Sequence, residues 1–352
     1  MHTHTHLLSL TLDNLKTALQ NEPAFRLKQT LAAFFSADFA DWASITTLPK
    51  TARSALQQTL PHTTITERQI LSSSDQETFK AILTLHDGLK VETVLMKNQR
   101  EQWTVCVSSQ VGCVMRCSFC ATGKMGQIRN LDALEIVEQL CFWKTFLKQK
   151  PEIPLFQKRI SNVVFMGMGE PLLNYDNVKA SLQLWLEHTD IGHNSITVST
   201  VGVLPALEKI LEDQTWPKVK IAISLHSADE IIRKTIVPSH SISFFDRLKA
   251  WCEAYEETLG ARTRPLTFEY VMLDHVNDAV SEATKLAKYL KKLNRVKVNL
   301  IPFNAVRDTP YLRSKRQTLE QFQNELKRFG VFATIRDTKG QDIEAACGQL
   351  IV

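Results

Sequence analysis

Apolar residues recur along this chain with two different spacings, and the first spacing is that of a helix. Over residues 1–85 they return every three or four positions, which places them on one face of a helix, and prolines interrupt the pattern. We therefore predict a small helical module there. A hairpin-like segment follows, because two alternating runs flank the turn pair Asp87 and Gly88. The predicted helices cover residues 7–19, 26–35 and 50–60, and the hairpin strands cover residues 81–86 and 89–96.

The second pattern begins at residue 103, where short apolar runs alternate with longer amphipathic stretches. The short runs predict strands at residues 103–108, 162–166, 195–199, 219–225, 266–272, 296–301 and 332–336. The longer stretches predict helices at residues 133–147, 177–187, 204–211, 244–259, 280–293 and 318–329. Repeated strand–helix units of this length indicate an α/β fold, with a parallel sheet or barrel and helices outside it. Catalytic residues should then gather where the strands end.

The composition fits an enzyme-sized chain without a membrane segment. The chain has 352 residues, of which 44% are hydrophobic, enough for one large domain and a smaller one. Its longest apolar runs are strand-sized, and its start lacks the basic and apolar segments of a signal peptide. We therefore expect a cytoplasmic protein that does not enter a membrane. In that compartment its seven cysteines favour metal or redox chemistry over a disulfide framework.

Positive charge is concentrated toward the C-terminus. The net charge is only +5, but residues 281–340 hold fourteen Lys and Arg against five Asp and Glu. For any one of these side chains, a solvated helix face is the simpler interpretation. Taken together, the excess suits a polyanionic partner such as RNA. Its main members are Lys291, Lys292, Arg295, Lys297, Arg313, Lys315, Arg316, Lys327 and Arg328.

Three cysteines stand directly after the first predicted strand of the second region. Residues 113–120 read CVMRCSFC, so Cys113, Cys117 and Cys120 have CxxxCxxC spacing. Three thiolates on one short loop can bind a cubane iron–sulfur cluster and leave one iron free for chemistry, whereas a cluster that only carries electrons usually takes four. A structural zinc site would need a fourth ligand close by, and no further cysteine follows before Cys141. The spacing therefore indicates a catalytic cluster.

Polar residues end or follow several other predicted strands. In the segment 166–171, Gly167 and Gly169 would let the backbone approach a ligand, and Glu170 would accept hydrogen bonds from an ammonium group or a ribose. A tight turn with a helix-capping Glu is the alternative. Similar placements on three further strands predict a cofactor-lined barrel mouth, although each residue alone is more typical of a turn or core. These residues are Ser199, Ser224, His226 and Asn304.

Two further cysteines lie where chemistry is possible. Cys106 is in the first predicted strand, seven residues before the cluster loop. Cys347 lies near the C-terminus between small residues, which favours an accessible loop over a packed core. Free cysteines are among the most buried residues, so inertness is the default. That default suits Cys141 and Cys252, which are on predicted helices, better than Cys347.

Together these motifs resemble those of the radical S-adenosylmethionine RNA methyltransferases that act on adenine, the RlmN/Cfr family. The resemblance implies a partial (β/α)6 barrel over residues 103–340, a helical accessory domain over residues 1–85 and a linker over residues 86–102. It also implies a C-terminal tail, residues 341–352, that carries a methyl-accepting cysteine. The matching segments are residues 91–94, 106–113, 117–123, 166–171, 224–226, 268–273, 298–303 and 342–350.

The resemblance also implies the cofactors and the residues that use them. A [4Fe-4S] cluster would be held by Cys113, Cys117 and Cys120, and two molecules of S-adenosylmethionine would be used in each turnover. One would methylate Cys347, and the second would be cleaved to a radical that activates this methyl group for addition to the base. Cys106 would resolve the adduct through a transient disulfide, and Glu92 matches the proton acceptor, with Cys106 as the alternative. The implied S-adenosylmethionine contacts are Gly169, Glu170, Ser199, Ser224, Leu225, His226 and Asn304.

The implied activity is methylation of adenine C2 in 23S rRNA and in tRNA, with electrons from a flavodoxin/reductase system. The segments 169–171 and 268–273 resemble the C2 enzymes more than those that methylate C8 of 23S rRNA adenine, which remains the alternative. Residues 237–244 depart from both types, so the substrate contacts of that loop are open. An alternative from another class is a non-catalytic RNA-binding protein with a structural metal, which would need neither Cys106 nor Cys347.

Overall fold

A single mixed sheet organises the molecule. Its order is β1-β2-β3-β4-β7-β8-β9-β10-β11-β12, in which β1 to β4 pair antiparallel and β4 to β12 pair parallel. The computed structural model describes residues 7–239, 241–259, 265–291, 293 and 296–352, so His240, Lys292 and Arg295 lie outside the described residues. The strands of this sheet are β1 (Ile65–Ser72), β2 (Thr78–Leu85), β3 (Lys90–Lys97), β4 (Trp103–Cys106), β7 (Ile160–Phe165), β8 (Ile196–Thr200), β9 (Lys220–Ser224), β10 (Thr267–Met272), β11 (Lys297–Pro302) and β12 (Phe332–Ile335).

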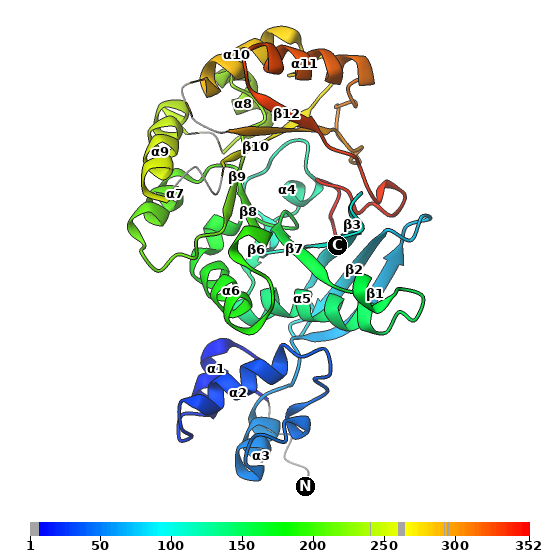
Figure 1. The fold of residues 1–352 in the computed structure, drawn as a ribbon, viewed down its shortest axis with the longest axis vertical. Helices are drawn as coiled ribbons and strands as arrows, with labels where there is room; N and C mark the ends of the chain where they lie inside the picture. The colour runs from blue at the N-terminus through cyan, green and yellow to red at the C-terminus, as the bar shows by residue number, and fades with distance from the viewer. Residues whose placement is uncertain (1–6, 240, 260–264, 292, 294–295) are drawn as a thin grey trace.

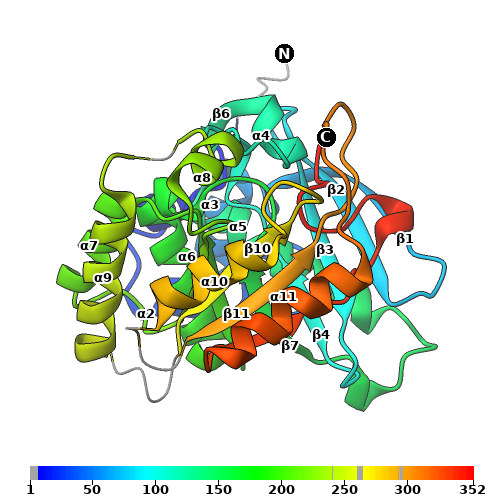
Figure 2. The same ribbon diagram turned by 90° about the horizontal axis from the view of Figure 1, so that it is seen from above.

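The parallel strands carry apolar side chains that are buried, and helices cover the outer face of this part of the sheet. Val163 and Phe165 of β7, and Ile221 and Ile223 of β9, are all at most 2% exposed. Helices α5 and α6, α7 and α9, and α10 and α11 pack in pairs around the curved sheet, as Figures 1 and 2 show. The main helices are α5 (Ala133–Lys148), α6 (Tyr175–His188), α7 (Leu204–Glu212), α8 (Glu230–Ile236), α9 (Phe244–Leu259), α10 (Val280–Leu290) and α11 (Arg316–Arg328).

A small hairpin and a short helix carry the cysteine-rich loop. The hairpin strands β5 (Gln110–Cys113) and β6 (Gly126–Asn130) pair antiparallel in a separate sheet, and α4 (Ala121–Met125) lies between them. Short 3-10 helices connect several elements elsewhere. They are η1 (Trp42–Ser44), η2 (Leu155–Gln157), η3 (Pro171–Asn174), η4 (His193–Ser195) and η5 (Gln341–Ile343).

The helical part at the N-terminus is shorter than the sequence predicts. Helices α1 (Leu12–Ala18), α2 (Phe25–Phe34) and α3 (Lys50–Thr59) form a layer at one end of the molecule (Figure 1), but residues beyond them form β1 and β2 and extend the main sheet. The pattern missed β1 because it is an edge strand with most of its side chains exposed, so it lacks a buried alternating face. Whether residues 1–85 form a domain of their own stays a prediction.

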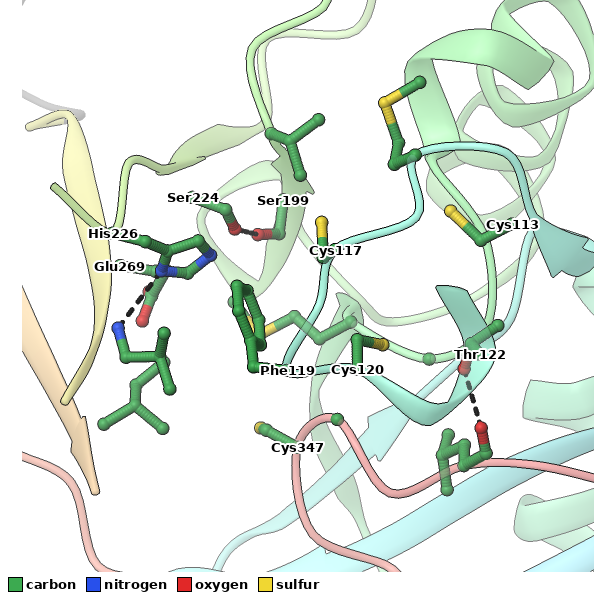
Figure 3. Close-up of a pocket in the computed structure, with 18 of the residues that line it drawn as sticks. Cys113, Cys117, Phe119, Cys120, Thr122, Ser199, Ser224, His226, Glu269 and Cys347 are labelled. Carbon is green, nitrogen blue, oxygen red and sulfur yellow. Dashed lines mark hydrogen bonds between the residues drawn. The ribbon is translucent and has the colours of Figure 1, made fainter. Parts of the chain in front are cut away.

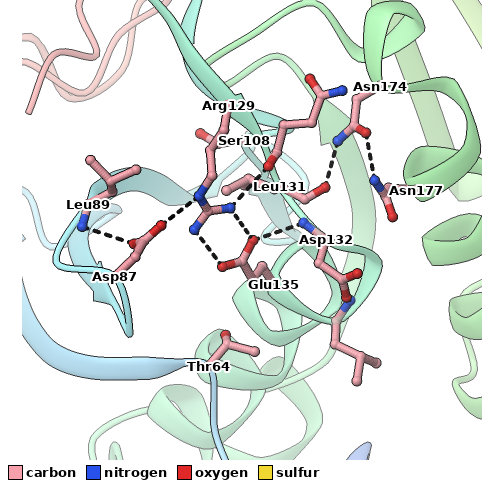
Figure 4. A network of polar contacts seen from close by, with 12 residues as sticks. Thr64, Asp87, Leu89, Ser108, Arg129, Leu131, Asp132, Glu135, Asn174 and Asn177 are labelled. Carbon is pink, nitrogen blue, oxygen red and sulfur yellow. Dashed lines mark hydrogen bonds and ion pairs between the residues drawn. The ribbon is translucent and has the colours of Figure 1, made fainter. Parts of the chain in front are cut away.

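A network of charged side chains joins the β2–β3 turn to the barrel (Figure 4). The Arg129 guanidinium donates to Asp87 in the turn at 2.6 Å and to both carboxylate oxygens of Glu135 on α5 at 2.8 Å. Asp132 caps α5 and forms a capping box with Glu135. The hairpin predicted as a linker is therefore fixed against α5.

The strand and helix positions predicted from residue 103 onward are confirmed, with shifts of a few residues at their ends. The short elements β5, β6, α4 and α8 were not predicted. Within the described part of the chain, no helix has the length and apolar character needed to cross a membrane.

Candidate active site

One large cavity opens where the parallel strands end. Its volume is about 1010 Å³, including the space at its open mouth, and it brings together residues from most of the parallel strands, the cysteine-rich loop and the C-terminal tail. Figure 3 shows the three loop cysteines and Cys347 around this space. The predicted site residues that line it are Cys113, Cys117, Cys120, Gly169, Glu170, Ser199, Ser224, His226, Asn304 and Cys347.

The cysteine-rich loop is held in shape by contacts at both ends. Cys113 is the last residue of β5 and pairs with Gly126 of β6. Cys117 packs in an apolar cluster with Ile236 and Phe303, and the backbone N–H of Ser118 donates to the carbonyl of Ile236 at 3.0 Å. Helix α8 therefore supports the loop from the side opposite to the hairpin.

The donor set fits an iron–sulfur cluster. Burial raises the pKa of Cys113 to about 12 and that of Cys117 well above its ordinary value, so both thiols are neutral until a cation binds. A cubane takes each cysteine on a different iron, and the three thiols of this loop open into the same cavity.

The two glycines after β7 are required by protein packing. A Cβ atom at Gly167 would lie 2.7 Å from the carbonyl oxygen of Val107. Gly169 has φ +99, and a Cβ there would lie 2.6 Å from the side chain of Gln110. The glycines therefore pack closely against the segment that leads from β4 into β5, and this packing places Glu170 at the cavity wall. Both glycines also line the cavity, so the approach of a ligand to them stays a prediction.

Glu170 takes the capping role that the sequence left as the alternative. One carboxylate oxygen accepts the N–H of Leu172 at 3.0 Å, and the other accepts the N–H of Val201 at 2.9 Å. Burial raises the pKa of Glu170 to about 7 despite these hydrogen bonds. The carboxylate joins the loops after β7 and β8 and also lines the cavity, so capping does not exclude a ligand contact.

Polar side chains on β8 and β9 face one another across the cavity wall. The hydroxyls of Ser199 and Ser224 lie 3.2 Å apart. His226 follows in a left-handed conformation with φ 61, and its Nδ1 accepts the N–H of Val271 at 3.1 Å. Burial, with a smaller effect of Arg233, lowers the pKa of His226 to about 3, so its ring is neutral at physiological pH. Its edge-to-face contact with Phe119 links this wall to the cysteine-rich loop (Figure 3).

Leu225 is not brought to the cavity by this fold. Its side chain is fully buried in the core. Its N–H donates to the backbone carbonyl of Glu269, and its own carbonyl accepts from the Arg233 guanidinium. Arg233 is 1% exposed and also donates to the carbonyl of Val201 at 2.7 Å, so it braces the ends of β8 and β9. The sequence analysis missed Arg233, because a single Arg in a polar stretch gives no local signal of burial.

The C-terminal tail folds back over the cavity and presents Cys347 to it. The Ala121 N–H, at the start of α4, donates to the carbonyl of Gly348 at 2.7 Å, and the Thr122 hydroxyl donates to the carbonyl of Leu350 at 2.7 Å. The Asn304 amide donates to the carbonyl of Cys347 at 3.0 Å. The Cys347 side chain is exposed to the cavity, whose walls raise its pKa by desolvation.

Cys106 and Glu92 lie behind the cavity wall. Cys106 ends β4 opposite Val94 of β3, and Glu92 lies two residues before Val94, on the same face of the sheet. Both are almost fully buried, and neither is among the described residues that line the cavity. Burial and, to a smaller extent, the Cys347 sulfur raise the pKa of Cys106.

Glu269 is a cavity residue that the sequence analysis did not single out. It lies on β10, is 4% exposed, and accepts a hydrogen bond from the Asn299 amide at 2.8 Å. Desolvation raises its pKa. A charged residue inside the otherwise apolar run 266–272 was the signal that could have revealed it.

Several basic residues of the region 281–340 serve local ion pairs. On α11, Arg316 pairs with Glu320 and Arg328 pairs with Glu325, each at 2.7 Å. On α10, Lys285 pairs with Asp229 at 2.7 Å. These contacts fit the interpretation of solvated helix faces for the residues involved, and RNA binding by the region stays a prediction.

Comparisons with known proteins show which family this chain resembles. The family described as the Radical SAM superfamily matches residues 107–287. A probable dual-specificity RNA methyltransferase RlmN from Acaryochloris marina is 39% identical over 331 residues, which cover 94% of this chain and 89% of that protein. The dual-specificity RNA methyltransferase RlmN from Desulfotalea psychrophila is 37% identical over 332 residues, with the same two coverages of 94% and 89%.

A solved structure is similar over nearly the whole length. The crystal structure of a radical SAM methyltransferase from Sphaerobacter thermophilus is 37% identical to this chain, with a TM-score of 0.86 and coverage of 97% of each chain. The similarity confirms the predicted α/β fold with a partial barrel.

Proposed function

We propose, because this chain belongs to the RlmN family of radical SAM RNA methyltransferases, that it methylates C2 of adenine in 23S rRNA and in tRNA. The observation that carries the proposal is that Cys347 and the three loop cysteines open into one cavity. An RNA-binding protein with a structural metal would have no use for a thiol held in that position.

The cavity residues divide between the two cofactors of the family. Cys113, Cys117 and Cys120 would hold a [4Fe-4S] cluster with one open iron. Together the cluster and S-adenosylmethionine supply the methyl group and the one-electron chemistry that activates it. The walls would hold S-adenosylmethionine through Gly169, Glu170, Ser199, Ser224, His226 and Asn304, and Leu225 would act only through its backbone position.

Cys347 is suited to carry the methyl group, because the tail presents its thiol to the cavity. When the sulfur is methylated, its S–H proton leaves and an S–C bond forms, while the bond between the methyl group and the sulfonium of S-adenosylmethionine would break and S-adenosylhomocysteine would leave. Desolvation by the cavity walls raises the pKa of the Cys347 thiol, and the Arg336 side chain acts in the opposite direction and favours the thiolate. A thiolate is therefore favoured only when positive charge is nearby.

Cys106 would release the product. After the Cys347 methylene carbon is bonded to the base, the Cys106 sulfur would attack the Cys347 sulfur and form a disulfide. The S–C bond breaks, its electron pair stays with the methylene carbon, and that carbon takes up the Cys106 proton to become the methyl group. Glu92 would accept the proton that leaves C2.

The partners follow from the same proposal. The target adenine must leave its stack to reach the cavity, as for other enzymes that modify bases. Basic side chains of the region 281–340 that face solvent would contact phosphates. A flavodoxin/reductase system would supply electrons, and the cytoplasm is the compartment in which both RNAs and this donor occur together.

The test is to reconstitute the cluster without oxygen and incubate the protein with S-adenosylmethionine, reductant and fragments of 23S rRNA or tRNA. Nucleoside mass spectrometry should find 2-methyladenosine, and Cys347→Ala should abolish it. Cys141→Ala is the matched control, because Cys141 lies on α5 away from the cavity, and this variant should retain activity. A product of 8-methyladenosine would contradict the C2 assignment, and full activity of Cys347→Ala would contradict the role of this thiol.

A further inference from the structure

A buried ion pair lies beneath the C-terminal tail, away from the cofactor ligands. The Lys80 ammonium on β2 is 3.0 Å from a carboxylate oxygen of Glu92 on β3, and the two side chains are 5% and 1% exposed. Lys80 lies opposite Val94, and Ile82 lies opposite Glu92, so the two charged residues are diagonal neighbours on one face of the sheet. Charged side chains are rarely buried so completely, which points to a purpose beyond packing.

The same face carries Cys106, one of the two cysteines of the proposed reaction. Cys106 lies opposite Val94, beside the position of Glu92. The tail covers this face, and the Lys80 ammonium donates a hydrogen bond to the carbonyl of Glu344 at 3.2 Å. Glu344 is three residues before Cys347. One ammonium group therefore contacts both the carboxylate of Glu92 and the segment that carries the reactive thiol.

We propose that Lys80 is a positioning residue that keeps Glu92 ionised and joins it to the seated tail. The inference rests on the proposed function, because it takes Glu92 as the group that accepts the C2 proton. In that step the C–H bond breaks, an O–H bond forms on Glu92, and the electron pair stays with the base. The unpaired electron that radical addition leaves on the base would pass to the [4Fe-4S] cluster, which restores the aromatic ring. A carboxylate can accept this proton only if it is ionised when the base arrives.

The charges around Glu92 show why Lys80 matters. Burial raises the pKa of Glu92, and the Glu344 carboxylate on the tail adds a small further rise. Lys80 from β2 and the Ile351 N–H from the tail act in the opposite direction. Cys106 from β4 adds no charge, because its own raised pKa keeps the thiol neutral. Lys80 thus provides the only full positive charge among the described groups that face Glu92.

The Lys80 ammonium lies 3.0 Å from one Glu92 oxygen and lowers the Glu92 pKa through hydrogen bonding and, to a smaller extent, through its charge. When Glu92 takes up a proton, the Glu344 carbonyl is the polar partner that Lys80 keeps among the described residues. A buried cation without its counterion is unfavourable, which promotes loss of the proton and resets the pair.

The direct test is the ionisation of Glu92, measured by infrared difference spectroscopy of the carboxyl band that disappears in Glu92→Gln. In the unsubstituted protein we expect Glu92 to be ionised at about pH 7, with a pKa at least about one unit higher in Lys80→Gln. Lys80→Arg keeps the charge and should restore the lower pKa. Lys339→Gln is the matched control, because Lys339 pairs with Glu77 and not with Glu92, and it should not change the titration.

Activity and tail mobility give independent readouts. The rate of 2-methyladenosine formation in Lys80→Gln should fall about 10- to 100-fold at pH 7 and recover as the pH rises, while methylation of Cys347 continues. Hydrogen exchange of residues 341–352 should be faster in Lys80→Gln than in the unsubstituted protein.

Several outcomes would overturn the inference: a protonated Glu92 at neutral pH in the unsubstituted protein, an unchanged titration in Lys80→Gln, or a raised pKa in Lys80→Arg. The first and last of these apply even if Lys80→Gln does not fold. Failure of the proposed function would appear differently, as an absence of methylated adenine in the unsubstituted protein while the titration of Glu92 still follows Lys80.

Discussion

At the scale of one residue, His226 both holds the backbone and lines the cavity. It takes a left-handed conformation with φ 61, and its Nδ1 satisfies the buried N–H of Val271 at 3.1 Å. The ring also lines the cavity beside the cysteine-rich loop. His275 has nearly the same backbone conformation, with φ 56, but its side chain is exposed. The two histidines therefore separate the effect of side-chain contacts from that of the backbone.

His226→Ala should destabilise the folded protein by about 1–3 kcal/mol, because it leaves a buried N–H without its acceptor. His275→Ala should change stability by less than about 0.5 kcal/mol. Urea unfolding of both variants at about pH 7 makes the comparison. Equal stability losses in the two variants would show that the hydrogen bond to Val271 does not contribute to the free energy of unfolding.

The lowered pKa of His226 predicts how the stability of the folded protein depends on pH. The pKa of His226 is lowered from its ordinary 6.5 to about 3, so its contribution to stability is complete above pH 6.5 and is lost as the pH falls toward 3. The unfolded chain binds this proton more readily than the folded one. His226→Ala should therefore lose less stability than the unsubstituted protein between about pH 7 and about pH 4.5.

Site residues could be predicted from sequence where one loop holds them. The spacing of Cys113, Cys117 and Cys120 is sufficient, because all three lie on eight consecutive residues. Lys80 and Glu92 meet only through the register of two strands, and Arg233 reaches Val201 from a different element. Such contacts leave no mark in the local pattern. The roles of Cys106 and Glu92 came from the family resemblance alone.

The loop from β7 to η3 shows the same limit at the scale of an element. The sequence indicated a tight, glycine-rich turn, which is correct, and the approach of a ligand to the glycines stays a prediction. Nothing in the sequence indicated that Gly169 also packs against Gln110, whose side-chain oxygen accepts the N–H of Glu170 at 2.8 Å. This contact spans sixty residues of sequence and fixes the loop that places Glu170.

Gly169→Ala should destabilise the protein by about 1–3 kcal/mol, because φ +99 disfavours a side chain and the new methyl group would overlap Gln110. Gly192→Ala is the matched control. Gly192 has φ −87 and no atom within 4 Å of a Cβ position, so its stability should change by less than about 0.5 kcal/mol. Thermal unfolding measures both, and an unchanged melting temperature for Gly169→Ala would contradict the packing argument.

Whole elements were predicted well when their pattern was long and buried. Strands β7 to β12 and the paired outer helices lie close to their predicted positions. The elements that were missed are short, such as α4 and α8, or exposed, such as β1. Short elements offer too few positions for a period to emerge, and an exposed strand lacks an apolar face.

At the scale of the whole molecule, the antiparallel extension and the C-terminal tail complete the site. The extension places Glu92 diagonally beside Cys106, with Lys80 one strand further away, and the tail closes over them with Cys347 at the cavity. Hydrogen bonds from Ala121 and Thr122 hold the tail against the cysteine-rich loop. The proposed reaction therefore requires Cys347 to carry the methyl carbon and Cys106 to release the methylated base.

The most direct test is to stop the reaction before the S–C bond breaks. Cys106→Ala, reconstituted without oxygen and given S-adenosylmethionine, reductant and target RNA, should accumulate protein covalently joined to RNA. Mass spectrometry after nuclease and protease digestion should find adenosine linked through one carbon atom to the peptide that contains Cys347, and Cys106→Ala/Cys347→Ala should form no such adduct. Normal release of 2-methyladenosine by Cys106→Ala, or an adduct on another residue, would contradict the account.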